Sequence, residues 1–244
     1  MQVFTAEVEA AKDLTHDVRE LELRLLSPGE IEFRPGQFIS FEIRVEGKPH
    51  PLTRAYSIAS PPSVRDRITL VFNRVDHGPG SRFLFGLKVG DRVQFKGPAG
   101  NFRLRDDGAR DLLFVATGTG IAPLRSMLFA QLSRETTPTV TLFWGLRSQR
   151  DMYYQQELEQ LATRHPNFHY VTALSRPEPG WSGETGRVTS LVSDRVEGVG
   201  NLAVYLCGNG GMIEDVTNWL RTKGLCPIYR EKWYDGPEEG APGQ

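Results

Sequence analysis

The stretch Leu112–Pro123, LLFVATGTGIAP, joins a compact apolar run to a glycine-rich turn and the start of a helix. Its first five residues are the kind of run that is buried on both faces of a parallel sheet. Gly118 and Gly120 permit a tight turn, and Pro123 suits the first turn of a helix. Such a turn, between a buried strand and a helix, cradles a pyrophosphate in Rossmann-like domains. Pro123 takes the place of the third glycine in G-x-G-x-x-G, so the match to that motif is incomplete.

The rest of the C-terminal half repeats this alternation. Further compact apolar runs lie at Val140–Gly145, Phe168–Ala173 and Leu202–Cys207. Between the first two of them, Met152–Ala162 places its apolar side chains on one helical face. Alternating strands and helices predict βαβ units and an open, doubly wound α/β parallel sheet.

The N-terminal half has a period of two. Val18–Leu25, Ile39–Val45, Arg67–Val75 and Arg92–Lys96 alternate apolar and polar residues, with Gly and Pro between the runs. This pattern predicts an antiparallel β-barrel or sandwich, interrupted by one short helix at Ser81–Leu87. We therefore expect a β-barrel domain at 1–105, an α/β domain at 111–235 and a flexible tail at 236–244, with the polar stretch 106–110 as the boundary.

Composition limits the function. A chain of 244 residues is long enough for two domains, and its net charge of -1 gives no overall attraction to nucleic acid. Two cysteines, Cys207 and Cys226, are too few for an iron–sulfur cluster held by four thiolates. The first residues lack a secretion signal, and no apolar run is long enough to span a bilayer. We expect free thiols, no metal, no nucleic-acid partner, no membrane span and a cytoplasmic location.

Two further motifs suit a ligand that carries phosphate and a flat ring. In Arg54–Ser57 (RAYS), an Arg fork can hold a diphosphate, a Tyr ring can stack on a heterocycle, and a Ser hydroxyl can bond a ring nitrogen. His77–Ser81 (HGPGS) opens the short helix, whose N-terminal N–H groups attract an anion. The alternative for the first motif is an ordinary strand without a ligand. The alternative for the second is a plain turn in which Ser81 is the helix N-cap.

A fourth motif, Leu206–Gly210 (LCGNG), comes at the end of a predicted strand. Ligands of open α/β sheets bind outside such strand ends. The alternative for Cys207 is a buried structural thiol.

Together the four motifs are recognisable. The order R-x-Y-S, G-x-x-S, G-T-G-I-A-P and C-G-N resembles the ferredoxin–NADP reductase superfamily, from about Pro35 to Asp235. The resemblance implies an N-terminal FAD-binding barrel, a C-terminal NAD(P)-binding domain, and a flavin at the cleft between them. The residues that it implies for binding the two cofactors through these motifs are Arg54, Ala55, Tyr56, Ser57, Gly80, Ser81, Thr117, Gly118, Thr119, Gly120, Cys207 and Gly208.

The resemblance also implies the residues next to the chemistry. Ser57 would lie near the reactive flavin nitrogen, and Cys207 and Glu231 would border the nicotinamide. One aromatic residue, Trp233 or Tyr234, would pack on the flavin. Glu231 and Trp233 are two apart, so on a strand they point to the same side, which favours Trp233 as a gate over the flavin.

The coenzyme is expected to be NADP, with NAD as the alternative. An NAD site places an acid about 20 residues past the glycine turn, whereas here a strand ends at Arg147. Arg147, Arg176 and Arg187 resemble the arginines with which bacterial relatives hold the 2′-phosphate. The alternative is that all three are solvated surface residues, and Asp151 argues for NADH.

The resemblance implies electron transfer between NAD(P)H and a separate one-electron carrier, with ferredoxin or flavodoxin preferred. The open alternatives are an NADH-dependent reductase component of a multicomponent oxygenase and a free flavin or ferric reductase. Outside the enzyme class, an electron-transfer subunit of a larger complex and a binding module without redox turnover also remain.

Overall fold

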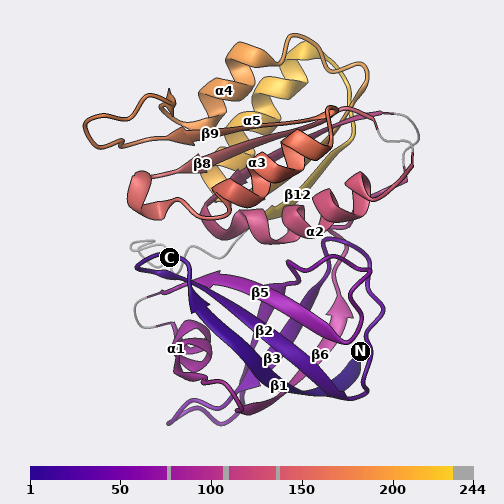
Figure 1. Cartoon of the computed structure of the whole chain (residues 1–244), viewed down its shortest axis with the longest axis vertical. Coiled ribbons are helices and arrows are strands. Elements are labelled where there is room, and N and C mark those ends of the chain that lie inside the picture. Colours follow the sequence, from indigo (N-terminus) through magenta and orange to yellow (C-terminus); the bar gives the residue numbers. More distant parts are fainter. Residues whose placement is uncertain (76–77, 107–109, 136–137, 233–244) are drawn as a thin grey trace, which may run out of the picture.

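The computed structural model describes residues 1–75, 78–106, 110–135 and 138–232. They form two domains, each built on a six-stranded sheet, which lie one above the other in Figure 1. The first sheet is antiparallel and the second is parallel, as the change of sequence period predicts.

The first domain is a curled antiparallel sheet with the strand order β4-β3-β6-β1-β2-β5. An isolated bridge between Ile58 and Leu70 brings the chain just after β4 against β5 and helps to curl the sheet. In β2, Leu21, Leu23 and Leu25 are buried inside, so the period-two prediction is confirmed. The strands are β1 (Gln2–Asp13), β2 (Val18–Ser27), β3 (Phe38–Ile43), β4 (Leu52–Ser57), β5 (Arg67–Asn73) and β6 (Arg92–Ala99).

The short helix of this domain, α1 (Pro79–Gly86), begins two residues before the predicted start. Pro79 occupies the first helical position, where its fixed φ suits the helix and its missing N–H costs nothing. Gly78 is the N-cap, so the alternative that Ser81 caps the helix is wrong. The Ser81 hydroxyl instead accepts a hydrogen bond from the Val75 amide at 2.9 Å.

The second domain is a doubly wound parallel sheet with the strand order β10-β9-β8-β7-β11-β12. Helices α2 and α3 pack on one face and α4 and α5 on the other (Figure 1). The strands are β7 (Asp111–Thr117), β8 (Val140–Leu146), β9 (Phe168–Leu174), β10 (Glu184–Thr185), β11 (Leu202–Gly208) and β12 (Ile228–Lys232). The helices are α2 (Ile121–Leu132), α3 (Gln155–Arg164), α4 (Val188–Arg195) and α5 (Gly210–Lys223).

Helix α3 is shorter than the predicted Met152–Ala162 at its start. Tyr154 has φ +56° and ψ 8°, a left-handed conformation that a helix cannot contain, and the helix begins after it. The periodicity of the apolar side chains continues through Tyr154, so the pattern alone placed the boundary too early.

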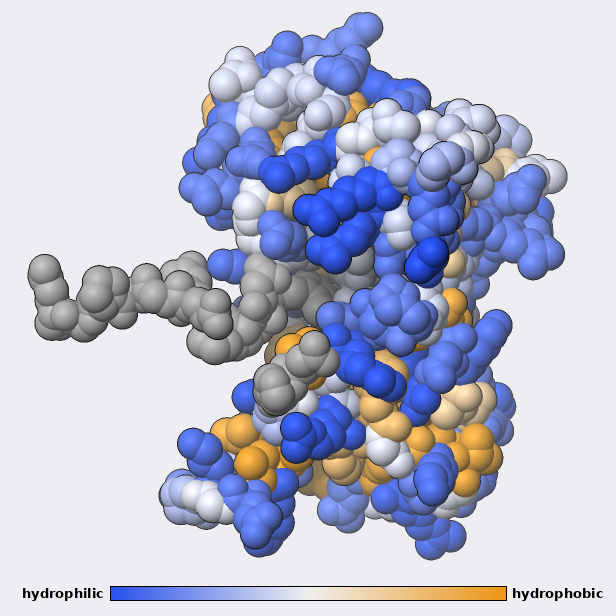
Figure 2. Space-filling model, turned by 90° about the vertical axis from the view of Figure 1, so that its left-hand side faces the viewer, coloured by the Kyte–Doolittle hydropathy of each residue, from blue (hydrophilic) through white to orange (hydrophobic). Residues whose placement is uncertain are grey.

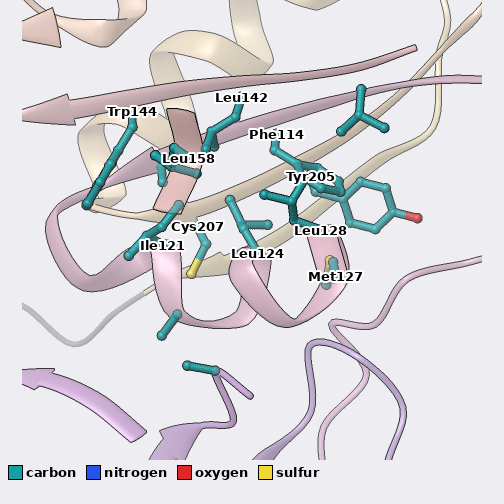
Figure 3. Packing of buried hydrophobic residues seen from close by; sticks show 14 of the residues in the cluster. Phe114, Ile121, Leu124, Met127, Leu128, Leu142, Trp144, Leu158, Tyr205 and Cys207 are labelled. Carbon is teal, nitrogen blue, oxygen red and sulfur yellow. The ribbon is translucent and has the colours of Figure 1, made fainter. Parts of the chain in front are cut away.

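One core cluster joins the two domains. Met127, Leu128 and their neighbours on α2 pack with Phe114 and Tyr205 of the sheet (Figure 3). The same cluster includes four buried residues of the first domain, which are Val18, Ala59, Val71 and Phe102. Gly36, with φ +97°, permits a close approach of the two domains, because a Cβ there would overlap the side chain of Met127.

The molecular surface differs between the domains on the face seen in Figure 2. Side chains over the second domain, in the upper half, are mostly hydrophilic, whereas the first domain carries several hydrophobic patches. Within the described ranges, no helix has the length and apolar character needed to cross a membrane.

Candidate functional site

The R-A-Y-S motif lies on β4, at the edge of the first sheet. The Tyr56 ring is half-buried and meets Phe41 and Phe72 edge-on, with ring centroids 6.0 and 5.7 Å away. Burial raises the pKa of Tyr56 to about 12, with Arg54 opposing the shift, so the phenol stays neutral near pH 7. Arg54 is exposed and bonds the Thr53 carbonyl at 2.9 Å, which leaves further N–H groups for an anion.

The glycine of the second motif lies directly against the first motif. A Cβ on Gly80 would overlap the Tyr56 hydroxyl and would lie 2.9 Å from Cγ of Arg54. Only glycine therefore allows the start of α1 to approach β4 this closely. The guanidinium, the helix start and the phenol ring form a cradle that fits the diphosphate and ring of FAD.

Ser57 and Glu231 connect the two domains. Ser57, at the end of β4, is 7% exposed, and its hydroxyl donates to Oε1 of Glu231 on β12 at 3.1 Å. Burial raises the pKa of Glu231 to about 7, although the bond from Ser57 works against the shift. This carboxyl therefore changes charge near neutral pH, and it can hold or release a proton at the Ser57 oxygen.

The two turns of the second domain interlock at the carboxyl ends of β7 and β11. A Cβ on Gly120 would overlap the carbonyl oxygen of Cys207. Thr117 Oγ1 accepts a hydrogen bond from the Asn209 amide at 2.8 Å. Asn209 also caps α5, since its side chain accepts from Gly211 N at 2.9 Å and from Met212 N at 3.3 Å. The N-termini of α2 and α5 thus lie side by side, an arrangement that attracts a diphosphate.

Thr119, within the first of these turns, also reaches the first domain. Its hydroxyl donates to Oδ1 of Asn73, at the end of β5, at 3.3 Å. Asn73 was not among the predicted site residues, and nothing in its local sequence distinguishes it from an ordinary strand end.

Cys207 is fully buried in the core cluster, near Ile121 in the close-up of Figure 3. On the sheet it lies between Ala116 and Glu231. Neither Cys207 nor Cys226 takes part in a disulfide within the described residues. Contact of Cys207 with the nicotinamide stays a prediction, because here the thiol is enclosed by apolar neighbours.

Several predicted features fall outside the described residues. They include both aromatic candidates for covering the flavin, Trp233 and Tyr234, and His77 at the start of the second motif. Most of the expected boundary, residues 107–109, and the expected tail, 236–244, are also outside.

The three arginines predicted to hold a 2′-phosphate follow the carboxyl ends of β8, β9 and β10. Arg147, Arg176 and Arg187 are all exposed, and the Arg176 amide donates to the Arg147 carbonyl at 2.7 Å. In the described part of the chain, none of the three guanidinium groups forms an ion pair. The Asp151 carboxylate already has local hydrogen-bond donors, since it accepts from the amide and the hydroxyl of Ser148, both at 2.8 Å. It therefore belongs to a capping box, which weakens the argument for NADH.

Sequence reasoning missed a basic cluster beside the domain boundary, which consists of Arg34, Arg103 and Arg105. Within the part of the chain that the structure describes, Nε of Arg103 and of Arg105 is buried without a hydrogen-bond partner. The charge of Arg34, followed by burial and by Arg105, lowers the pKa of Arg103. Arg105 also lies 5.6 Å over the ring of Tyr229. Arg34 precedes β3, whereas Arg103 and Arg105 both follow β6, so only the fold brings these two segments and their charges together.

Comparison with known proteins agrees with this geometry. Residues 5–104 match the oxidoreductase FAD-binding domain, and residues 114–218 match the oxidoreductase NAD-binding domain. The phenol 2-monooxygenase reductase component DmpP of Pseudomonas sp. (strain CF600) is 36% identical, over 96% of this chain and 67% of the relative. Ferredoxin–NADP reductase B of Sorangium cellulosum is 35% identical, over 89% of this chain and 91% of the relative.

Among solved structures, the ferredoxin reductase in carbazole 1,9a-dioxygenase is 27% identical with a TM-score of 0.81, over 96% of this chain and 70% of that one. The two domain matches account for the order of the four motifs and for the two sheets that carry them. The chain is a flavoprotein oxidoreductase with FAD-binding and NAD-binding domains, and it belongs to the ferredoxin–NADP reductase superfamily.

Proposed function

We propose that this protein transfers electrons between NADPH and a separate one-electron carrier, either ferredoxin or flavodoxin. The observation that carries the redox assignment is the Ser57–Glu231 hydrogen bond across the domain boundary, in which the carboxyl has a pKa of about 7. The relative that is named a ferredoxin–NADP reductase matches over most of both chains and supports the choice of carrier.

The residues divide the work between the two cofactors. Arg54 and the start of α1 at Gly80 would hold the FAD diphosphate, and Tyr56 would stack on the ring. The turn Gly118–Gly120 would hold the coenzyme diphosphate at the N-terminus of α2. Bound FAD would supply the redox chemistry that couples a two-electron hydride donor to a one-electron carrier. Trp233 as the aromatic that covers the ring stays part of the proposal.

Ser57 and Glu231 would handle the accompanying proton. With Glu231 ionised, the Ser57 hydroxyl donates to it, as observed, and the Ser57 oxygen can accept a proton from a ring nitrogen. With Glu231 protonated, the carboxyl donates to Ser57, whose own proton is then free for the ring. A change of charge near pH 7 lets this pair work in both directions.

Preference for NADPH rests on Arg147, Arg176 and Arg187. Their guanidinium groups are exposed at the sheet edge that carries the coenzyme turn. An Arg fork binds a phosphate with two parallel hydrogen bonds, whereas the ribose hydroxyls of NADH offer no such charge.

Arg176→Ala is expected to lower kcat/KM for NADPH about 10- to 100-fold, because it removes charge-assisted hydrogen bonds to the 2′-phosphate. The value for NADH should change less than about threefold. Steady-state kinetics with both coenzymes measure this, and Arg164→Ala, an exposed arginine on α3, is the control. An equal loss with both coenzymes, or a wild-type preference for NADH, would reject the assignment.

The basic cluster supports an acidic carrier. Arg103, whose pKa is lowered first by the charge of Arg34, and Arg105, which lies over Tyr229 of β12, bring positive charge to the domain boundary. Complementary charges accelerate encounter more than they strengthen the final complex, and salt screens them.

Arg103→Gln is therefore expected to raise KM for ferredoxin or flavodoxin about tenfold at low salt, and the difference should shrink at high ionic strength. Reduction of ferricyanide by NADPH should stay unchanged. Arg92→Gln, on β6 and strongly exposed, is the control. If an oxygenase component accepts electrons faster than either carrier, the alternative suggested by the phenol 2-monooxygenase relative is correct.

A further inference from the structure

Arg125 connects the segments that carry the two cofactor motifs. It lies on α2, which begins immediately after the coenzyme turn Gly118–Gly120. Its Nη1 donates to the carbonyl oxygen of Ala59 in the first domain at 2.9 Å. Ala59 follows the R-A-Y-S motif by two residues and is fixed in turn, since its amide donates to the Thr69 carbonyl at 2.8 Å. A single side chain thus ties the coenzyme helix to the end of the flavin strand.

The second domain holds this guanidinium rigidly. Nε and Nη2 bond the two carboxylate oxygens of Glu157 on α3 at 2.7 and 2.6 Å. The rings of Phe129 and Tyr154 lie 4.8 and 4.7 Å from Cζ. The side chain is only 14% exposed. A two-pronged ion pair between two rings leaves the Arg fork little freedom, so the Nη1 group that reaches Ala59 points in a fixed direction.

Tyr154 makes a second crossing at the same place. Its hydroxyl donates to the Glu20 carboxylate on β2 of the first domain, while its ring covers Arg125. Among the residues that the structure describes, Tyr154 is the only one other than glycine that has a positive φ. A bulky residue in this conformation is strained, and such strain persists only where surrounding contacts enforce it.

Arg125 does not touch the site itself. Neither the predicted cofactor residues nor the Ser57–Glu231 pair is among its hydrogen-bond partners, which are Glu157 and Ala59. Its position on α2 still matters for the coenzyme site. The coenzyme turn directly precedes α2, and Arg125, which bonds Ala59 of the first domain, lies one helical turn further along. A tilt of α2 relative to β4 would change the distance between nicotinamide and flavin directly.

We propose that Arg125 is a positioning residue, which, with Glu157 and Tyr154, fixes the angle between the two domains and so the approach of the nicotinamide to the flavin. The proposal rests on hydride transfer between the two cofactors. That step needs reacting atoms about 3–3.5 Å apart, and an error of about 1 Å costs roughly 100-fold in rate. A residue that sets the angle therefore controls the rate without contacting either ring.

The structural part of the proposal is tested without turnover. Spin labels are attached at Val89→Cys and Leu225→Cys, which are 66% and 95% exposed and lie in different domains. Cys226→Ser removes the half-buried native thiol, and the buried Cys207 is left in place. Pulsed electron resonance on the FAD-loaded protein without coenzyme should give a narrow distance distribution. Arg125→Lys, which keeps the charge but loses the fork, should broaden or shift it.

The kinetic part uses stopped-flow reduction of the flavin by saturating NADPH. Arg125→Lys should lower the limiting rate about 10- to 100-fold, with FAD retained and coenzyme Kd changed less than about threefold. Arg195→Lys is the control, since Arg195 pairs with Glu184 within the second domain alone. An unchanged distance distribution, or an unchanged limiting rate, would overturn the proposal.

Two milder variants keep the test usable if Arg125→Lys does not fold. Glu157→Gln replaces the ion pair by a neutral hydrogen-bond acceptor, and Tyr154→Phe removes only the bond to Glu20. Each should broaden the distances and lower the limiting rate by a smaller factor, about threefold to tenfold. No effect of either on both readouts would count against the proposal. If neither NADPH nor NADH reduces the wild-type flavin, the proposed function is wrong. The distance measurement would still show whether Arg125 fixes the angle between the domains.

Discussion

Gly120→Ala is expected to destabilise the protein by about 3 kcal/mol and to abolish coenzyme binding. A Cβ at this position would overlap the carbonyl oxygen of Cys207, and would lie 2.7 Å from its carbonyl carbon and 2.9 Å from Cα of Gly208. All three atoms belong to the backbone at the end of β11, which cannot rotate away as a side chain can. The turn or the strand end must therefore move, and the coenzyme cradle between them is lost.

Gly118→Ala is the matched control in the same turn. Gly118 has φ +51°, but an added Cβ would meet nothing within 4 Å. Its cost is therefore only that of a left-handed alanine, about 1 kcal/mol. Urea unfolding gives both stabilities, and calorimetric titration gives the coenzyme affinities. Equal destabilisation by the two variants would mean that backbone conformation, rather than the close packing of the two turns, makes this loop depend on glycine.

Glu231→Gln is expected to remove an ionisation near pH 7 from the pH profile of flavin re-oxidation by ferricyanide. In the wild type the rate should rise with pH through about 7, because only the ionised carboxyl can draw a proton through Ser57. Glutamine keeps the size and can still accept the Ser57 bond, but it cannot take the proton. The re-oxidation rate above pH 7 should fall about 100-fold and become independent of pH.

The same substitution has a signature in stability. Below pH 4.5 the carboxyl is protonated in the folded and the unfolded chain. Between 4.5 and about 7 the unfolded chain ionises first, so the free energy of unfolding falls as pH rises through that window. The loss should be on the order of 2–3 kcal/mol in the wild type and absent in Glu231→Gln. Glu214→Gln, an exposed carboxylate on α5, is the control. If wild type and Glu231→Gln show parallel stability curves, the carboxyl titrates normally.

The sequence predicts the two sheets because each side-chain period follows directly from which faces are buried. β2 and β7 are clear cases, since β2 alternates and β7 has an unbroken apolar centre, Leu112–Ala116. β1 was missed as a strand. Only Phe4, Ala6 and Val8 alternate in it, and register shifts between residues 5 and 6 and between 8 and 10 interrupt its pairing. The start of α3 was misplaced because the left-handed Tyr154 is stabilised by contacts far away in the chain.

The site shows the same division. Motifs singled out Arg54, Tyr56 and the glycines as candidates, because close approach and ring stacking restrict the residue type locally. They did not predict that the Ser57 hydroxyl meets the Glu231 carboxylate, two residues separated by 174 positions. The roles of Arg125 and of the basic cluster could not be predicted for a similar reason. The sequence does not distinguish a buried, paired arginine on a helix or in a loop from a solvated one, because its neighbours come from distant parts of the chain.

The core cluster that spans both domains limits how such proteins are recombined. Ala59, Val71 and Phe102 of the barrel lie in the same packed interior as Met127 of α2, so one core cluster continues across the boundary in addition to the clusters that each domain has to itself. A chimaera that joins the barrel of one relative to the α/β domain of another would bring together core residues that did not evolve to pack against each other. If the proposed arginines set coenzyme specificity, grafting the loops after β8, β9 and β10 would exchange it with less damage to this interior than exchanging the whole α/β half.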